Sequence, residues 1–202
     1  GLNYRKPYPV DGVAPPDPSQ IILFGKERDT LLGHQQKLET PAGPAAHSFD
    51  FEGEIAVIIG TGGRHITADD AMTHVMGYSI FNDGSVRDWQ KHSIYAGKNF
   101  SGSGSWGPWI TTADEIKNPA TMSLTTHLNG QQMQNTTADQ MIYSIAAQIS
   151  YASHLYELQP GDIIATGSPD GTGGSHTPKR YLQEGDLLEI AVSGIGLLQN
   201  NI

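Results

Sequence analysis

Short apolar runs, rich in β-branched residues and separated by glycine-containing turns, dominate the hydrophobic pattern of this chain. The clearest run, Ile55–Ile59, lies within Phe49–Gly60. Runs of this length and composition favour strands over helices. On this basis we expect further strands at Ile21–Lys26, near Leu38, and at Val75–Phe81, Pro108–Thr112, Ile163–Thr166, Asp186–Ser193 and Ile195–Gln199.

Turn signals and one helical period complete the picture. Met122–Asn129 and Gln131–Gln134 are predicted to form a hairpin that turns at Asn129-Gly130, a pair typical of two-residue hairpin loops. Thr137–Tyr156 is the one clear helix, because apolar residues recur along it at helical spacing. Ala96–Gly107 is glycine-rich and is expected to be a loop over a site. The pattern predicts one α+β domain dominated by strands.

The ends and overall charge narrow the class of protein. Residues 1–20 hold five of the 12 prolines and are predicted to be a mobile lead-in or lid to a single catalytic domain spanning 1–202. A net charge of −9, with no run of Lys and Arg, argues against nucleic acid and anionic membranes as partners. The chain has no cysteine, no apolar stretch long enough to span a membrane and no signal-peptide pattern, so a cytoplasmic location is expected.

Three carboxylates stand at the ends of two predicted strands. Glu52 and Glu54 are two residues apart, so they point to the same face of an extended chain. Taken alone, such a pair is usually a solvated strand end. Asp83, which closes the run Val75–Phe81, adds a third carboxylate. An all-oxygen set of this kind suits Mg²⁺ or Mn²⁺, or Ca²⁺ in a crystal.

Candidate ligand-binding residues follow Asp83 closely. Arg87, Gln90 and Lys98 supply the hydrogen-bond donors that the carboxylate and carbonyl groups of a keto-acid substrate require. The eight histidines form no helical pair of metal-ligand type and are expected at the surface or in lids. The glycine-rich segment TGSPDGTGG lacks the Gly-Lys-Ser/Thr ending of a phosphate-binding loop, so nucleotide binding is a poor interpretation.

Several segments together resemble the fumarylacetoacetate hydrolase family. They include LFGK, FDFEGEIAVIIG, GYSIFNDGSVRDWQ, GKNF and PGDIIATGSPDGTG, in the family's order over nearly the whole chain. The resemblance implies a mixed β-roll or β-sandwich-like fold with few short helices, and a homodimer. It also implies bound Mg²⁺ or Mn²⁺ and small-molecule substrates with a 1,3-dicarbonyl or 2-keto-acid core.

The resemblance also implies roles for individual residues. Glu52, Glu54 and Asp83 match the three metal carboxylates of the family. Lys98 matches its catalytic lysine beside the metal. The residues that match substrate-contacting positions are Arg87, Gln90, Ser168 and, less securely, Lys26.

One departure from the family pattern concerns the general base. Many members of the family carry a His and, three residues later, a Glu just after the segment N-Y-R, and this pair activates the attacking water. Here N-Y-R continues into Lys6-Pro7-Tyr8-Pro9, with neither residue present. The base is therefore unassigned, and His34, His47 and His92 are the spare histidines in neighbouring loops.

The function predicted from the sequence is a divalent-metal-dependent hydrolase that cleaves a carbon–carbon bond in acylpyruvate or related 2,4-diketo acids. The alternative is a decarboxylase or isomerase of a 2-keto/enol dicarboxylic acid, which gains ground if the His and Glu are absent, because no water need then be activated. A metal-stabilised binding protein is the non-enzymatic alternative. The segment Trp106–Trp109 is the candidate anchor of a homodimer, with a place in the core as the other interpretation of the two tryptophans.

Overall fold

Two sheets packed face to face form the body of the protein in the computed structural model, which describes residues 1–5 and 16–202. The larger sheet has the strand order β1-β6-β4-β3-β9, with bounds Leu31–Leu32, Gly104–Thr112, Val75–Asn82, Gly53–Ile59 and Ile163–Ala165. The smaller has the order β11-β10-β7-β8, with bounds Gly196–Asn201, Leu187–Val192, Ser123–Leu128 and Gln131–Thr137. Only the pair β1–β6 is parallel among the recorded pairings of these two sheets.

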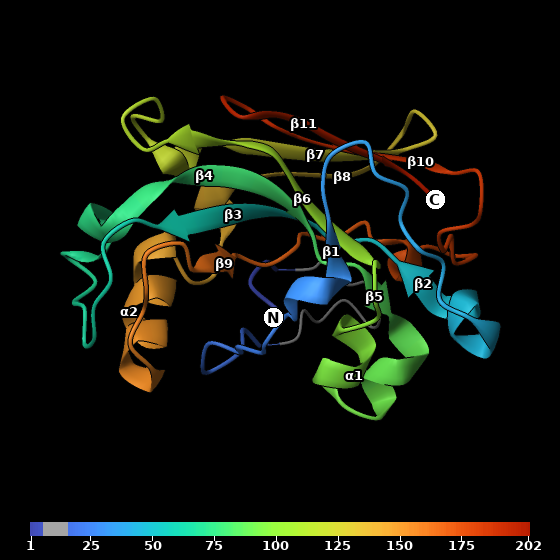
Figure 1. Ribbon diagram of the computed structural model, residues 1–202, viewed down its shortest axis with the longest axis horizontal. Coiled ribbons are helices and arrows are strands. Elements are labelled where there is room, and N and C mark those ends of the chain that lie inside the picture. The colour runs from blue at the N-terminus through green and yellow to red at the C-terminus, as the bar shows by residue number, and fades with distance from the viewer. Residues whose placement is uncertain (6–15) are drawn as a thin grey trace.

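Helices are few and short. Two α-helices, α1 (Ile94–Lys98) and α2 (Ile145–Leu155), lie on the side of the larger sheet away from the smaller one (Figure 1). A two-stranded ladder joins β2 (Phe49–Asp50) to β5 (Ser85–Val86). Single 3₁₀ turns occupy Arg28–Thr30, Gly43–Ser48, Ala71–His74, Arg87–Lys91 (η4), Pro119–Thr121, Ala138–Gln140 and Gly173–Ser175. The expected strand-dominated α+β fold is therefore present. No helix in the described part of the chain is long and apolar enough to cross a membrane.

The alternation of side chains along β3 divides the core from the functional face. Ile55, Val57 and Ile59 are fully buried in the main hydrophobic core, which the smaller sheet also lines. Glu54, Ala56 and Ile58 point the other way, and the latter two form a second cluster with Phe81. The strand therefore places Glu54 beside a small apolar surface rather than in the main core.

The predicted hairpin is confirmed. β7 and β8 pair antiparallel, and both residues of the connecting Asn129-Gly130 turn have positive φ angles, of 53° and 79°. Such angles are typical of a two-residue hairpin loop, and glycine adopts them without steric cost. The predicted strands at 75–81, 108–112, 163–166, 186–193 and 195–199 are also found, with ends shifted by a few residues. The strand predicted at 49–60 is broken at residues 51 and 52 into β2 and β3, which belong to different sheets.

Two predicted strands are absent. The segment 21–26 is extended but joins no sheet, because the Asn99 side chain takes the place of a neighbouring strand. It donates to Gly25 O (3.0 Å) and accepts from Glu27 N (2.7 Å). Near Leu38 there is likewise no strand, although Leu38 is fully buried.

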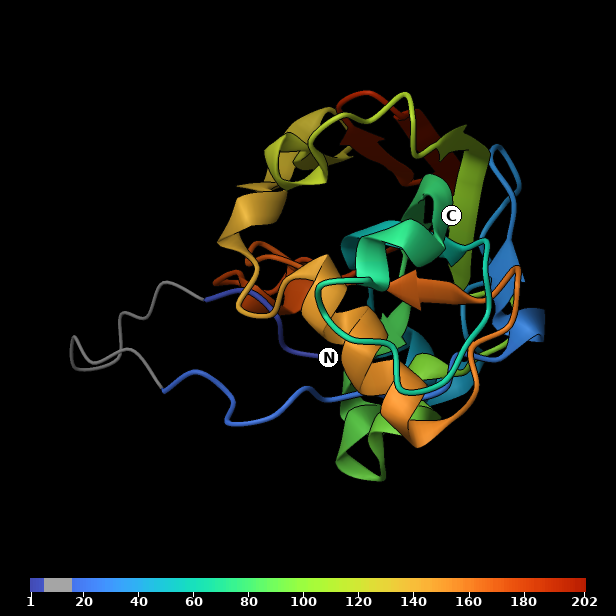
Figure 2. The same cartoon turned by 90° about the vertical axis from the view of Figure 1, so that its left-hand side faces the viewer.

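The predicted helices also differ in their limits. The helix expected from Thr137 begins only at Ile145, because Asn3 is hydrogen-bonded to the backbone just before it. The main-chain oxygen of Asn3 accepts from Ile142 N, and its side-chain oxygen accepts from Tyr143 N. The N-terminal residues consequently lie beside the start of α2 (Figure 2). The expected loop at 96–107 is partly helical, since α1 starts at the Ser93 cap and ends at Lys98. Residues 6–15 of the predicted lead-in or lid lie outside the described residues.

Candidate active site

Three carboxylates converge where β3 begins and β4 ends. Glu52, Glu54 and Asp83 each contribute an oxygen atom to a group in which all atoms lie within 4.8 Å of one another. Antiparallel pairing of the two strands brings this about, because Asp83 N donates to Glu52 O (2.9 Å) just beyond the last paired residues. Like charges this close repel unless a cation or a proton separates them.

The donors fit a divalent cation. All three side chains offer oxygen, the ligand preferred by Mg²⁺, Mn²⁺ and Ca²⁺. Asp83 Oδ1 is buried and receives no aligned hydrogen bond within the described residues, although Lys26 Nζ lies 2.9 Å away. The triad could therefore bind such a metal.

Lys98 bridges two of the carboxylates. Its Nζ atom lies 2.6 Å from Glu52 Oε2 and 2.7 Å from Asp83 Oδ2. Burial lowers the pKa of Lys98, but the two carboxylates outweigh this effect and hold the pKa above its ordinary value. The lysine is thus held as a cation beside the triad.

Gly97 allows this placement of Lys98. A Cβ atom on Gly97 would lie 2.3 Å from Gln90 Cγ, so only glycine lets α1 pack closely on η4. Gln90 itself is half-buried at this contact.

Lys26 approaches the triad from the extended segment 21–27. Its Nζ atom lies 2.9 Å from Asp83 Oδ1, outside hydrogen-bonding alignment, and donates to the backbone oxygens of Gly84 and Lys98. Burial lowers the pKa of Lys26, and the opposing effect of Asp83 is smaller. Two lysines therefore face the same carboxylates with opposite shifts of pKa.

The two glutamates of the triad differ in the same way. Burial, then the charges of Asp83 and Glu52, raise the pKa of Glu54 to about 8. Burial also opposes ionisation of Glu52, but Lys98 and Arg87 outweigh it and hold the pKa of Glu52 well below its usual range. In the metal-free protein, Glu54 is thus the carboxyl of the triad that carries a proton at neutral pH.

Arg87 lies against protein carboxylates. Its Nε atom donates to Asp50 Oδ2 (2.7 Å) and its Nη1 atom to Glu52 Oε1 (2.5 Å). Nη2 is buried without a partner among the described residues. These contacts fix the orientation of Glu52 and leave one nitrogen of the guanidinium for a further acceptor.

Asp50 is a residue of the site that our sequence reasoning missed. It is fully buried, and its Oδ1 accepts from Phe51 N and Gly173 N, while Oδ2 accepts from Gly174 N and Arg87. It thereby ties the loop after β9 to the arginine that orients Glu52. The available signal was spacing, because Asp50, Glu52 and Glu54 follow one another at every second position.

Ser168 lies in the loop that follows β9. It is 9% exposed, and its Oγ atom accepts a hydrogen bond of 2.8 Å from Gln134 Nε2. The preceding residue, Gly167, donates from its backbone N–H to Glu54 Oε2 (2.7 Å). The loop that carries Ser168 is therefore attached directly to the carboxylate triad.

A cleft of about 940 Å³ opens onto the triad. Glu54, Asp83 and Lys26 line it, together with an apolar wall that includes Phe81 and Trp106. Among the described residues of this lining there is no histidine. Of the three spare histidines, His34 accepts from Gln199 N, His92 packs edge-on against Trp89, and His47 lies in the 3₁₀ turn before β2.

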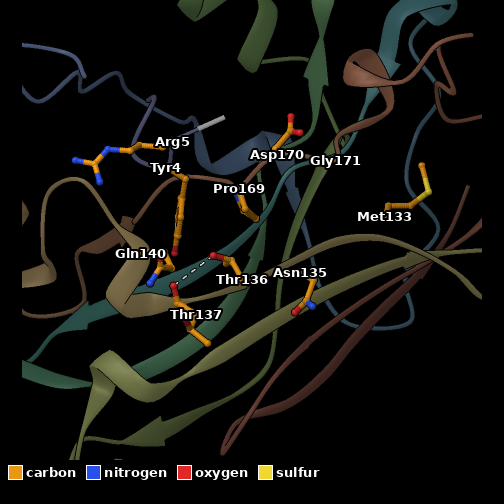
Figure 3. Close-up of a pocket in the computed structure, with 10 residues that line it drawn as sticks. All are labelled: Tyr4, Arg5, Met133, Asn135, Thr136, Thr137, Gln140, Pro169, Asp170 and Gly171. Carbon is orange, nitrogen blue, oxygen red and sulfur yellow. Dashed lines mark hydrogen bonds between the residues drawn. The ribbon is translucent and has the colours of Figure 1, made fainter. Parts of the chain in front are cut away.

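A second cavity, of about 590 Å³, lies near the N-terminal residues. Figure 3 shows Tyr4 within it, close to Thr137 and Gln140, with Pro169 and Asp170 on another side. It contains none of the three converging carboxylates. We therefore assign the candidate active site to the larger cleft.

The fold and site define a class of protein, a strand-rich domain with a carboxylate triad that could hold a divalent metal in an open cleft. The family model described as fumarylacetoacetate (FAA) hydrolase C-terminal matches residues 1–202. The chain belongs to the fumarylacetoacetate hydrolase family.

Individual relatives carry different activities in their names. The chain is 36% identical to oxaloacetate tautomerase YisK of Bacillus subtilis over 204 residues, which cover all of this chain and 67% of that protein. Oxaloacetate tautomerase FAHD2A of Homo sapiens, a mitochondrial protein, is 32% identical, with 100% and 64% of the two chains covered. The chain thus spans about two thirds of the length of the curated relatives it matches.

A solved structure adds a metal. Fumarylpyruvate hydrolase from Pseudomonas aeruginosa, in complex with Mn²⁺ and pyruvate, matches with a TM-score of 0.78 and 29% identity, covering 88% of this chain and 76% of that one. The relatives are therefore enzymes that include both tautomerases and a hydrolase.

Proposed function

We propose that this chain is the catalytic domain of a divalent-metal-dependent isomerase that interconverts the keto and enol forms of a 2-oxo dicarboxylic acid. This was the alternative to carbon–carbon bond hydrolysis in the sequence analysis, and the tautomerase relatives support it better. The observation that carries it is the convergence of Glu52, Glu54 and Asp83 with two lysines, beside a cleft that Glu54, Asp83 and Lys26 line and whose described lining has no histidine.

The residues of the triad would hold the metal, with Mg²⁺ or Mn²⁺ as the proposed ion. When bound, such a cation acts as a Lewis acid that stabilises negative charge on the 2-oxo oxygen and the neighbouring carboxylate. Arg87 contributes by fixing Glu52, which it contacts through Nη1. Glu54 is oriented by the N–H of Gly167.

Proton movement falls to the lysines in this proposal. Tautomerisation takes a proton from the carbon beside the 2-oxo group and places one on the oxygen. We assign this task to Lys26 Nζ, because it lines the cleft beside Asp83 and burial lowers its pKa. Lys98 remains a cation beside Glu52 and Asp83 and would stabilise charge that develops on the substrate oxygen.

Hydrolysis is the second candidate function, and the likeness to fumarylpyruvate hydrolase favours it. It requires a base to activate water, a role for which the described cleft offers no histidine. The positions after N-Y-R, where the sequence has Lys6 to Pro9, lie outside the described residues. A histidine base for hydrolysis would therefore have to come from outside the described lining of the cleft.

A product assay separates these activities. Metal-loaded protein is mixed with oxaloacetate in its enol form, and the loss of enol absorbance is followed against buffer with metal alone. Acceleration without release of pyruvate supports the isomerase, whereas stoichiometric pyruvate and carbon dioxide indicate a decarboxylase. Cleavage of acetylpyruvate to acetate and pyruvate, without acceleration of enol loss, would replace the isomerase by the hydrolase.

A homodimer and a cytoplasmic location also remain proposals. Trp109, one of the two predicted anchors, is 58% exposed, and its ring lies against Gly196. Exposed aromatic surface of this kind supports an interface. Trp106, by contrast, is half-buried and lines the cleft. Because some relatives are mitochondrial, the cellular compartment of this protein has to be tested by cell fractionation.

A further inference from the structure

A buried amide connects the carboxylate strand to the loop that carries Ser168. Strand β3 pairs antiparallel with β9 up to Ala56 and Ala165. The next residues continue the same register, and Thr166 N donates to Ile55 O (3.0 Å). At Gly167 the ladder changes, because its N–H meets the Glu54 side chain rather than the backbone.

At the following position the two chains separate, and the Gln134 side chain fills the gap. Gly53 N donates to Gln134 Oε1 (2.9 Å), and Gln134 Nε2 donates to Ser168 Oγ (2.8 Å). Gln134 is 1% exposed. Gly53 leaves the necessary space, since a Cβ atom there would lie 2.3 Å from Thr126 Oγ1.

The hydrogen bonds of this amide fix its orientation. Its oxygen also accepts from Thr126 Oγ1 (2.9 Å), and its nitrogen also donates to Pro169 O (2.9 Å). A backbone N–H can only donate and a carbonyl oxygen can only accept, so the amide cannot be reversed. Both hydrogens on Nε2 are therefore committed, one of them to Ser168.

The polarity of the Ser168 hydroxyl follows from this arrangement. Because Oγ accepts from Gln134, its own hydrogen is available to a different acceptor. Gln134 Nε2 is a hydrogen-bond donor and cannot take up the hydroxyl proton, so the contact does not activate Ser168 as a nucleophile. The hydroxyl can therefore act as a donor, and it lies next to Gly167, whose N–H contacts Glu54 of the triad.

We propose that Gln134 is a positioning residue that holds Ser168 as a hydrogen-bond donor toward a carboxylate or enolate oxygen of the substrate. The inference rests on the proposed function for the identity of the substrate. It assigns the site a preference for ligands with an acceptor at this point, over analogues that place an ammonium group there.

A double-mutant cycle tests the coupling. S168A, Q134L and the double variant are compared for kcat/KM with oxaloacetate and for the Kd of malate, a four-carbon diacid that cannot enolise, in the Mn²⁺-loaded protein. S168A is expected to weaken both quantities roughly ten- to hundredfold, the loss typical of one hydrogen bond to a charged group. Q134L should match it, and the double variant should lose no more than S168A alone.

Two further variants guard against a purely structural effect. T126V removes one hydrogen bond to the same amide without touching its nitrogen, so malate affinity should stay within about twofold of the wild type. Q134E keeps the size of the side chain but presents an acceptor to Ser168, so it should weaken malate binding while Mn²⁺ affinity is retained. This variant also serves if Q134L fails to fold.

Three results would overturn the proposal. The first is wild-type malate affinity in S168A, and the second is a loss of malate affinity on Gln134→Leu that is as large in the S168A background as in the wild-type protein. The third is a loss of malate affinity in T126V as large as that in Q134E. Malate binding does not require turnover. Coupled losses of malate affinity in a protein that fails to tautomerise oxaloacetate would therefore reject the proposed function and keep this inference.

Discussion

The backbone N–H of Gly167 donates a 2.7 Å hydrogen bond to Oε2 of Glu54. This contact joins β3, which carries Glu54 of the carboxylate triad, to the loop that carries Ser168. Gly167 has a φ angle of 104°, and a Cβ atom there would lie 2.6 Å from Asn3 Cβ. The segment N-Y-R therefore packs directly on the loop, and three distant parts of the chain define one site.

The carboxylate triad should control metal binding. Asp83→Ala is expected to weaken Mn²⁺ binding about 100-fold or more and to abolish activity, because one anionic ligand is lost. Isothermal titration calorimetry measures the affinity. Glu184→Ala is the matched control, since Glu184 is exposed and pairs with Lys37 at the surface. Equal Mn²⁺ affinity in both variants would refute the assignment.

Metal binding should depend on pH through Glu54. Its pKa of about 8 exceeds the ordinary value, so below pH 8 a cation must displace a proton from it. The apparent affinity for Mn²⁺ should rise about tenfold per pH unit between pH 6 and 8 and level off above. Titrations in buffers of different ionisation enthalpy would report the released proton. A flat affinity over this range would contradict the raised pKa.

Lys98 is expected to act in the chemical step. Lys98→Met keeps the length of the side chain and removes the charge, so kcat should fall by roughly 10² to 10³, the usual effect of losing one donor to developing charge. Bound Mn²⁺ should be retained. Lys91→Met, at an exposed residue that pairs with Asp88, is the control and should leave kcat unchanged. Wild-type kcat in the Lys98 variant would exclude it from catalysis.

Asp50 should be required for stability as well as for the site. Asp50→Ala leaves the buried Arg87 without one partner and two glycine N–H groups unpaired. Removing one member of a buried pair costs about 3–5 kcal/mol. For a chain of this size that corresponds to a fall in Tm of roughly 6 °C or more. A thermal melt of the metal-free protein that shows no change would contradict the role assigned to Asp50.

The proposed homodimer can be tested at Trp109. Light scattering at micromolar concentration should give twice the monomer mass for the wild-type protein and monomer mass for Trp109→Ser, because an exposed aromatic anchor is lost. Trp89→Ser, at another partly exposed tryptophan, should remain dimeric. Monomer mass for the wild-type protein would rule out the dimer, and a monomeric Trp89 variant would move the interface away from Trp109.

The sequence by itself determined those features that depend on local geometry. Residues two apart on a strand share a face, so Glu52 and Glu54 had to point together. The Asn129-Gly130 turn could be predicted because both residues tolerate positive φ angles. Many short apolar runs typical of strands, with few segments of helical spacing between them, were enough to predict the fold class.

Tertiary structure decided which distant groups meet. Nothing local predicts that Asn99 would satisfy the backbone at Gly25, and so keep 21–26 out of the sheets, or that Asn3 would delay the start of α2. The partners of Arg87 and the bridging amide of Gln134 likewise come from contacts between elements far apart in the chain. Buried polar groups must find hydrogen-bond partners wherever packing brings them, and that choice is made only when the sheets and loops assemble.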